Sequence, residues 1–169
     1  MVQVKKDKLL LRPEDIKPSS NKLEVIGVLN PAAVRLPNGN VFLYVRVIER
    51  LKKFKDSGSY YSPRCVGKDK FKLKIDRFSK GFVLGSDDFG IEFKNKTKRL
   101  TFISHLRKVI LDKDGFRILS IDKRPSFYGL GNDAELGVED PRITEIHGKY
   151  YMTYVGLTRK ESISTNLAV

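Results

Sequence analysis

The sequence predicts an all-β fold, and three observations support this class. Short runs rich in β-branched and aromatic residues recur, turn-forming residues separate them, and no segment keeps a helical spacing of apolar residues for three turns. Helix signals are confined to one turn at residues 12–15 and a short helix at 47–54. The runs that predict strands are residues 23–28, 41–48, 71–75, 100–104, 117–121, 149–155 and 162–168.

The composition is that of a single soluble domain. The 169 residues are 40% hydrophobic and 31% charged, which is enough apolar material for one core. Lysines interrupt the apolar residues of the first eleven positions, so no signal peptide is recognisable. No later run approaches the roughly 20 apolar residues of a membrane span. We therefore expect a cytoplasmic protein without a membrane partner.

Cysteine and histidine are scarce, which argues against a bound metal. Cys65 is the single cysteine, and the two histidines, His105 and His147, have neither the partners nor the spacing of a zinc site. The sequence predicts no metal and no cofactor.

A formal net charge of +13 raises the question of nucleic acid. Basic clusters at residues 52–55, 68–74 and 94–99 have tyrosines and phenylalanines near them, as some nucleic-acid-binding surfaces do. However, no helix-turn-helix, zinc-finger or RNA-recognition signature is present. The charge also fits attraction of phosphate or another small anion. A non-catalytic basic binding or assembly protein is therefore the second of two hypotheses.

The most distinctive stretch is Gly-Val-Glu-Asp-Pro-Arg-Ile at residues 137–143, directly before a predicted strand. Proline disfavours helical backbone at the preceding residue, so Asp140 is expected on extended chain with its side chain opposite that of Glu139. Adjacent carboxylates resist joint ionisation, which suits proton transfer. On such a chain Arg142 would pair with Asp140 and favour its carboxylate form. The alternative is an ion-paired turn that leads into a strand.

An internal repeat predicts how the strands are arranged. Residues 30–45 and 140–154 share one plan: Asn30 or Asp140 before a proline, a short strand, a turn with glycine and a longer apolar strand. Such a unit repeated around an axis is a β-propeller blade, whose inner strand starts with a polar residue facing the central channel. Asn30 and Asp140 would then lie at equivalent places at the mouth of the channel. Two unrelated hairpins with common turn chemistry are the alternative.

Four motifs, at residues 30–34, 41–46, 137–143 and 148–154, resemble those of glycoside hydrolase family 130, the β-mannoside phosphorylases and hydrolases. They read Asn-Pro-Ala-Ala-Val, Val-Phe-Leu-Tyr-Val-Arg, Gly-Val-Glu-Asp-Pro-Arg-Ile and Gly-Lys-Tyr-Tyr-Met-Thr-Tyr. The resemblance covers residues 22–48 and 126–169. Family members are five-bladed β-propellers, which implies that this chain is an N-terminal part with about one and a half to two blades.

The resemblance implies a carbohydrate-active enzyme that cleaves β-mannosides or related oligosaccharides with inversion. Asp140 matches the family's general acid, which passes its proton to the glycosidic oxygen through a hydroxyl of the sugar. Asn30 and Arg46 match residues that bind the mannose. Glu139 and Arg142 would orient the acid or contact the sugar. The glycosyl group would pass to inorganic phosphate, giving mannose 1-phosphate, or to water, so phosphate is implied as a co-substrate.

Two features depart from the family pattern. Asn30 and Asp140 are further apart than one blade requires, so residues 50–100 are expected to be a basic insertion within the first blade. The chain also stops before the family's phosphate-binding residues, so we expect an incomplete active site and association through exposed sheet edges if the chain folds alone. Tyr128 and Glu135, just ahead of the motif, are further candidates for lining a sugar site.

Overall fold

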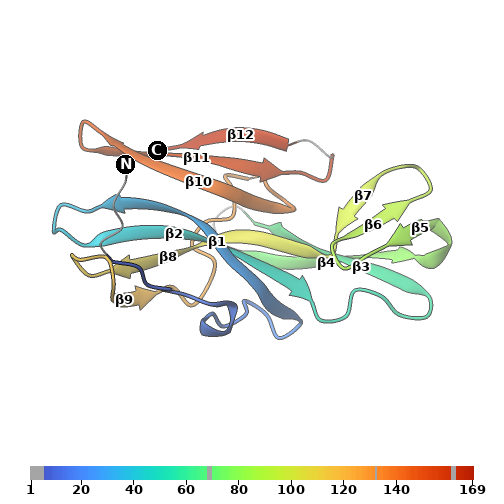
Figure 1. Ribbon diagram of the computed structural model, residues 1–169. Helices are drawn as coiled ribbons and strands as arrows, with labels where there is room; N and C mark the ends of the chain where they lie inside the picture. The colour runs from blue at the N-terminus through green and yellow to red at the C-terminus, as the bar shows by residue number, and fades with distance from the viewer. Residues whose placement is uncertain (1–5, 68–69, 132, 161–162) are drawn as a thin grey trace.

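The computed structural model describes residues 6–67, 70–131, 133–160 and 163–169, and strands dominate it (Figure 1). The all-β prediction is confirmed. In chain order the strands are β1 (Leu23–Arg35), β2 (Val41–Leu51), β3 (Ser59–Val66), β4 (Lys72–Ser79), β5 (Val83–Ser86), β6 (Gly90–Phe93), β7 (Lys98–Leu100), β8 (Phe102–Leu111), β9 (Ile118–Ile121), β10 (Gly137–Ile146), β11 (Lys149–Leu157) and β12 (Ile163–Ala168), with the 3-10 helices η1 (Pro13–Asp15) and η2 (Lys80–Phe82).

Most predicted strands are present with longer bounds, and η1 confirms the predicted turn at residues 12–15. The short helix expected at residues 47–54 is wrong, because β2 continues to Leu51. Every second residue of β2 is buried, so the alternation that defines a half-buried strand persists to its end. Ser162, the first residue of the last predicted strand, lies outside the described residues.

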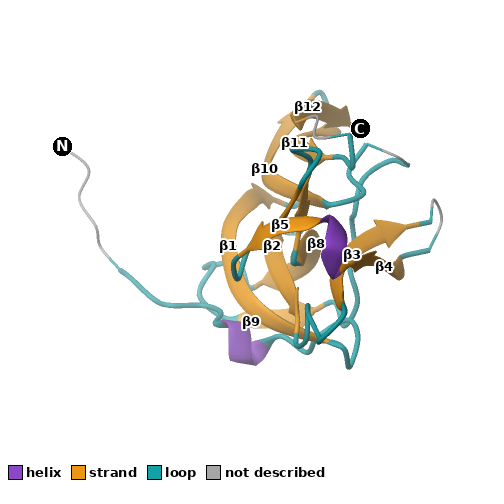
Figure 2. Ribbon diagram, turned by 90° about the vertical axis from the view of Figure 1, so that its right-hand side faces the viewer, coloured by secondary structure: helices purple, strands orange, loops and turns teal. Residues whose placement is uncertain are grey.

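Two antiparallel units make up the main sheet (Figures 1 and 2). The first unit consists of β1, β2, β8 and β9, and the second unit of β10, β11 and β12. One parallel residue pair, Gly137 with Ser104, links them into a single sheet of order β1-β2-β8-β10-β11-β12, with β9 beside β8. The first strand of the second unit, β10, also lies beside β1. This is the arrangement of two neighbouring propeller blades, and the partial β-propeller prediction is confirmed.

The residues between β2 and β8 form a separate region, the 52–101 segment. The strands β2 and β8 pair as direct neighbours, from Val41 with Leu111 to Arg50 with Phe102. The segment between them folds into two small sheets, β3–β4 and β5–β6–β7, at one end of the main sheet (Figure 1). A chain can leave and re-enter a hairpin in this way without disturbing it. That the segment is an insertion relative to the family stays a prediction.

Three apolar clusters hold these parts together. Between the two units, Leu106 and Val138 pack with Met152 and Tyr154. Between the first unit and β3–β4, the cluster comprises Leu23, Leu51, Cys65 and Ile103. Beneath the first unit, Leu43, Val45, Val109 and Leu111 are covered in part by Leu10 and Leu11 of the N-terminal segment. The alternating side chains of the strands therefore bury both faces of the first unit.

The face of the first unit that carries the N-terminal segment also contains a buried charged cluster. Glu49 of β2 and His105 and Arg107 of β8 are at most 1% exposed. Ser19 donates its backbone N–H to Glu49 Oε1 at 2.6 Å and its hydroxyl to Oε2. Arg107 Nη2 lies 3.3 Å from Oε1, and His105 Nε2 lies 3.4 Å from Oε2. The cluster therefore ties the N-terminal segment to the two central strands.

Stability is expected to decrease as the pH falls below 6.5 because of this cluster. Burial lowers the pKa of His105 below the ordinary 6.5, so the unfolded chain takes up a proton that the folded chain does not. Burial alone would raise the pKa of Glu49, but its interaction with His105 and the hydrogen bonds from Ser19 outweigh burial and lower it. Each group therefore stabilises the fold above its ordinary pKa and loses that contribution as the pH falls.

Urea titrations between pH 6.5 and 5 should show the free energy of unfolding decreasing by up to about 1.4 kcal/mol for each pH unit. His147 lies in the exposed turn after β10, so His147→Gln should leave this slope unchanged. His105→Gln should flatten it between pH 6.5 and 5, whatever its effect on stability at pH 7. The same slope in His105→Gln as in the wild type would contradict the assignment.

Candidate functional site

Matching irregularities occur in β1 and β10. Each strand loses register with its hairpin partner at an Asn-Pro or Asp-Pro step. Asn30 and Asp140, the residues before the prolines, have φ values of +44° and +47°. Asparagine and aspartate enter this left-handed region more readily than other side-chain-bearing residues, and proline has no N–H that needs a ladder partner. The shared β-bulge supports the internal repeat over the alternative of two unrelated hairpins.

Two expectations about this repeat are wrong. Asp140 is not on extended chain, because proline disfavours right-handed helical backbone at the preceding residue but leaves the left-handed region open, and the bulge uses it. Nor do the inner strands start at the polar residues, since β1 begins at Leu23 and β10 at Gly137. As a result, the side chains of Glu139 and Asp140 do not point to opposite sides but reach the same guanidinium.

Four of the five predicted site residues meet at one point. Asn30 Nδ2 donates to Asp140 Oδ1 at 2.5 Å, across the boundary between the two units. Arg46 Nη1 lies 3.4 Å from the same oxygen, and Arg46 Nη2 pairs with Glu139 Oε1. The Arg46 side chain is 11% exposed and that of Asp140 is 44% exposed. A largely buried cation therefore holds a carboxylate that remains open to a ligand.

Arg142, the fifth predicted residue, does not join this group. Its Nη1 donates to the backbone oxygen of Pro141 at 2.9 Å, so the expected ion pair with Asp140 is wrong. The bulge separates the two side chains, and Arg46 supplies the cation instead. The other two candidates also lie elsewhere. Tyr128 packs on Phe71, and Glu135 accepts from Arg159 Nε at 2.7 Å.

Sequence reasoning missed Ser104, which supports the site from β8. Its side chain is fully buried, and Oγ donates to Glu139 Oε1 at 3.2 Å. Gly137, its partner in the parallel pair, has a φ of +150°, and a Cβ there would lie 2.5 Å from Ser104 Oγ. Only glycine allows β10 to approach so closely. The glycine was visible in the motif, but a serine within a strand carries no signal that could reveal its partner.

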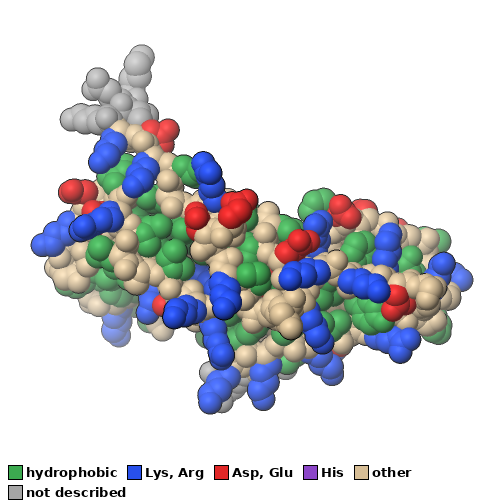
Figure 3. Space-filling model, turned by 90° about the horizontal axis from the view of Figure 1, so that it is seen from below, with side chains coloured by type: hydrophobic (Ala, Val, Ile, Leu, Met, Phe, Trp, Pro, Cys, Tyr) green, Lys and Arg blue, Asp and Glu red, His purple; other side chains and the backbone are tan. Residues whose placement is uncertain are grey.

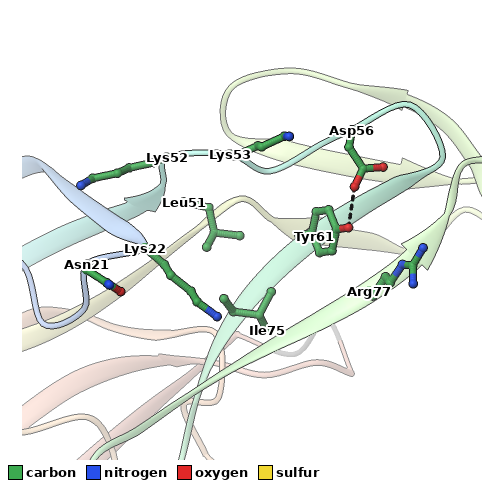
Figure 4. A pocket seen from close by; sticks show the side chains of 9 residues that line it. All are labelled: Asn21, Lys22, Leu51, Lys52, Lys53, Asp56, Tyr61, Ile75 and Arg77. Atoms are coloured by element: carbon green, nitrogen blue, oxygen red, sulfur yellow. Dashed lines mark hydrogen bonds between the residues drawn. The ribbon is translucent and has the colours of Figure 1, made fainter.

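A cavity lined by basic residues does not show this convergence of polar groups. The cavity, of about 570 Å³, lies between the end of β2 and the β3–β4 sheet (Figure 4). Lys22, Lys52, Lys53 and Arg77 line it, but the Lys52 and Lys53 side chains point in different directions, and Tyr61 donates to Asp56 at 2.6 Å.

Within the described ranges, no group of three or more His, Cys, Asp or Glu residues is arranged to hold a metal. None of the helices in these ranges is long and apolar enough to cross a membrane.

The chain is similar to known phosphorylases in sequence and in fold. The glycoside hydrolase family 130 model, described as beta-1,4-mannooligosaccharide phosphorylase, matches residues 107–168. A beta-1,2-mannobiose phosphorylase from Listeria innocua is 29% identical over 154 residues, which are 86% of this chain and 41% of that protein. The solved structure of beta-1,2-mannobiose phosphorylase from Listeria innocua in complex with beta-1,2-mannobiose matches with a TM-score of 0.73 and 26% identity, over 92% of this chain and 44% of that one. The resemblance to glycoside hydrolase family 130 is thereby confirmed, and the chain spans less than half the length of these relatives.

Proposed function

We propose that this chain carries part of the active site of an inverting β-mannoside phosphorylase, with Asp140 as the general acid. The observation that carries the proposal is the meeting of Asn30, Arg46 and Asp140 at one point, because they come from three strands of two repeated units. Rigid strands hold polar groups more precisely than loops do, and convergent polar groups orient a small ligand. Glu139 is assigned to orienting the acid and Arg142 to contacting the sugar.

The contacts to Asp140 fix the position of its carboxyl group. Asn30 and Arg46 both engage Oδ1, which restricts the rotation of the carboxyl group. An inverting reaction needs the acid on one side of the sugar and room for a nucleophile on the other. The partly exposed Asp140 can meet a sugar hydroxyl and through it the leaving oxygen, while Asn30 and Arg46 hold the mannose by hydrogen bonds. No cofactor enters this chemistry.

Inorganic phosphate is the proposed nucleophile because the matched family model and the Listeria innocua relative are both named as phosphorylases. Hydrolysis, in which water replaces phosphate, is the other outcome that the product assay described below distinguishes.

We further propose that the protein acts in the cytoplasm, where phosphate and sugar phosphates are available. Association of copies through the edge strand β12, which exposes Ile163 and Leu167, also stays a prediction.

A product assay tests the proposal. The protein expressed from its complete reading frame is incubated with β-1,2- and β-1,4-linked manno-oligosaccharides, with and without inorganic phosphate. Mannose 1-phosphate should appear only when phosphate is present. Equal amounts of free mannose under both conditions would indicate a hydrolase, and the absence of both products from every substrate would contradict the proposal.

The second hypothesis, a basic binding or assembly protein, has no specific observation in its favour. On the face shown in Figure 3, lysine and arginine side chains are spread over the whole length of the molecule, with acidic groups between them. Nucleic-acid-binding surfaces concentrate their charge in a patch or stripe. The basic charge on this face is therefore assigned to the solvated surface.

A further inference from the structure

The face of β2 that carries Arg46 continues beyond the second unit. Alternate residues of a strand share a face, so Arg46, Ile48 and Arg50 point to the same side. Ile48 pairs with Ser104 of β8, the residue that also pairs with the first residue of β10. Arg50, the next residue of β2 on this face, pairs with Phe102. Arg50 therefore lies just outside the second unit, roughly 14 Å along the strand from Arg46.

Arg50 has carboxylate partners from two different parts of the chain. Its Nε and Nη2 donate to Glu24 Oε1 of β1 at 3.1 and 2.9 Å. Its Nη1 lies 3.7 Å from Oδ2 of Asp88, which belongs to the turn between β5 and β6. The 52–101 segment thus reaches back to the strand face that carries the proposed active site.

The turn that contributes Asp88 is held rigidly. Asp87 Oδ1 accepts the N–H groups of Phe89 and Gly90 at 2.8 and 2.7 Å, and these bonds lower the pKa of Asp87. Thr101 is fully buried, and its hydroxyl donates to the backbone oxygen of Asp88 at 2.5 Å. Its N–H donates to the backbone oxygen of Phe89 at 3.1 Å. These bonds fix the backbone on both sides of Phe89.

Phe89 is nevertheless 61% exposed. Its ring is nearly perpendicular to that of Phe102, with the ring centroids 6.4 Å apart, and Phe102 pairs with Arg50. A large aromatic ring that a rigid turn presents to solvent beside charged groups is typical of a ligand contact, because a flat apolar face and fixed polar groups together orient a ligand.

We infer that Phe89, Asp88 and Arg50 form a distal sugar subsite, which binds the units of a manno-oligosaccharide beyond the mannose held by Arg46. The apolar C–H face of a sugar ring can stack on Phe89, while its hydroxyls donate to Asp88 and accept from Arg50. The inference rests on the proposed function and deepens it, because it makes oligosaccharides longer than a disaccharide the preferred substrates. The 52–101 segment then sets the length specificity.

The test compares two chain lengths, mannobiose and mannotetraose, of the linkage, β-1,2 or β-1,4, that the product assay shows to be cleaved. In the protein expressed from its complete reading frame, Phe89→Ala should raise KM for mannotetraose about two- to tenfold and leave kcat unchanged. Both constants for mannobiose should stay at the wild-type values. Phe82→Ala is the matched control, because Phe82 is 69% exposed on the same segment but lies at the opposite end of β5.

Other results would overturn the inference. Equal loss for both sugars would make Phe89 a structural residue, and unchanged constants for both would remove it from the substrate path. A change of oligomeric state in Phe89→Ala without a change in KM would make the turn a contact between copies. Absence of cleavage of every β-1,2- and β-1,4-linked sugar in the product assay would refute the proposed function itself, whereas activity on mannobiose with no effect of Phe89→Ala on mannotetraose refutes the subsite alone.

Discussion

Asp140→Asn should lower kcat for β-mannoside cleavage by a factor of about 10² to 10⁴, the usual contribution of a general acid. The amide has nearly the same shape, and its oxygen can still accept from Asn30 and Arg46, so the fold and the contacts at this point should persist. What disappears is the proton that the leaving oxygen needs. The measurement is the initial rate of mannose 1-phosphate formation at saturating substrate and phosphate.

The control for this variant is Asp114→Asn. Asp114 is exposed in the turn between β8 and β9, outside the group around Asp140, so its replacement should leave kcat unchanged. Thermal unfolding of both variants should match the wild type, which separates lost chemistry from lost structure. Wild-type kcat in folded Asp140→Asn would remove Asp140 as the acid.

Glu49→Gln should lower the free energy of unfolding by about 3 to 5 kcal/mol, the cost of removing one partner from a buried ion pair. Glu49 is fully buried, and its carboxylate faces Arg107 and His105 while accepting two hydrogen bonds from Ser19. The glutamine amide carries no charge, so it leaves the Arg107 guanidinium without a counter-charge in the core. Urea unfolding at pH 7 measures the loss.

Glu14→Gln is the matched control for Glu49→Gln. Glu14 is exposed in η1, on the same N-terminal segment that Ser19 belongs to, so its replacement should change stability by less than about 0.5 kcal/mol. Replacing both Glu49 and Arg107 by apolar residues of similar size should recover much of the loss. A single Glu49→Gln variant as stable as Glu14→Gln would show that the cluster adds nothing to stability.

The strands were predictable where the alternation of side chains is a local property. β2 and β11 have apolar residues at the period that a half-buried strand requires, and both were predicted. β3 and β6 were missed because their burial depends on partners elsewhere in the fold: β3 packs against the first unit, and β6 contributes buried Ile91 and Phe93 to a small sheet. A short run of mixed residues carries no sign of such partners.

The candidate site was also predictable in part: the equivalence of its two central residues was predicted, but the backbone and the cation were not. The likeness of the two proline-containing units predicted that Asn30 and Asp140 occupy equivalent positions, and the two side chains are hydrogen-bonded. The backbone at Asp140 was predicted wrongly, because the proline excludes one conformation while strand pairing chooses between the others. Arg142 was chosen as the counter-ion for its nearness in sequence, but the cation comes from Arg46.

The sequence by itself determined the all-β class, the repeated unit and the acidic motif, since these depend on residue types at short spacings. The tertiary structure alone decided that Arg46 bridges both carboxylates, that Ser104 supports Glu139 and that Glu49 is buried against Arg107. Each of these contacts joins residues that are 35 or more positions apart. Which side chains face one another across strands depends on register and on bulges, and chain segments acquire these only when they pair.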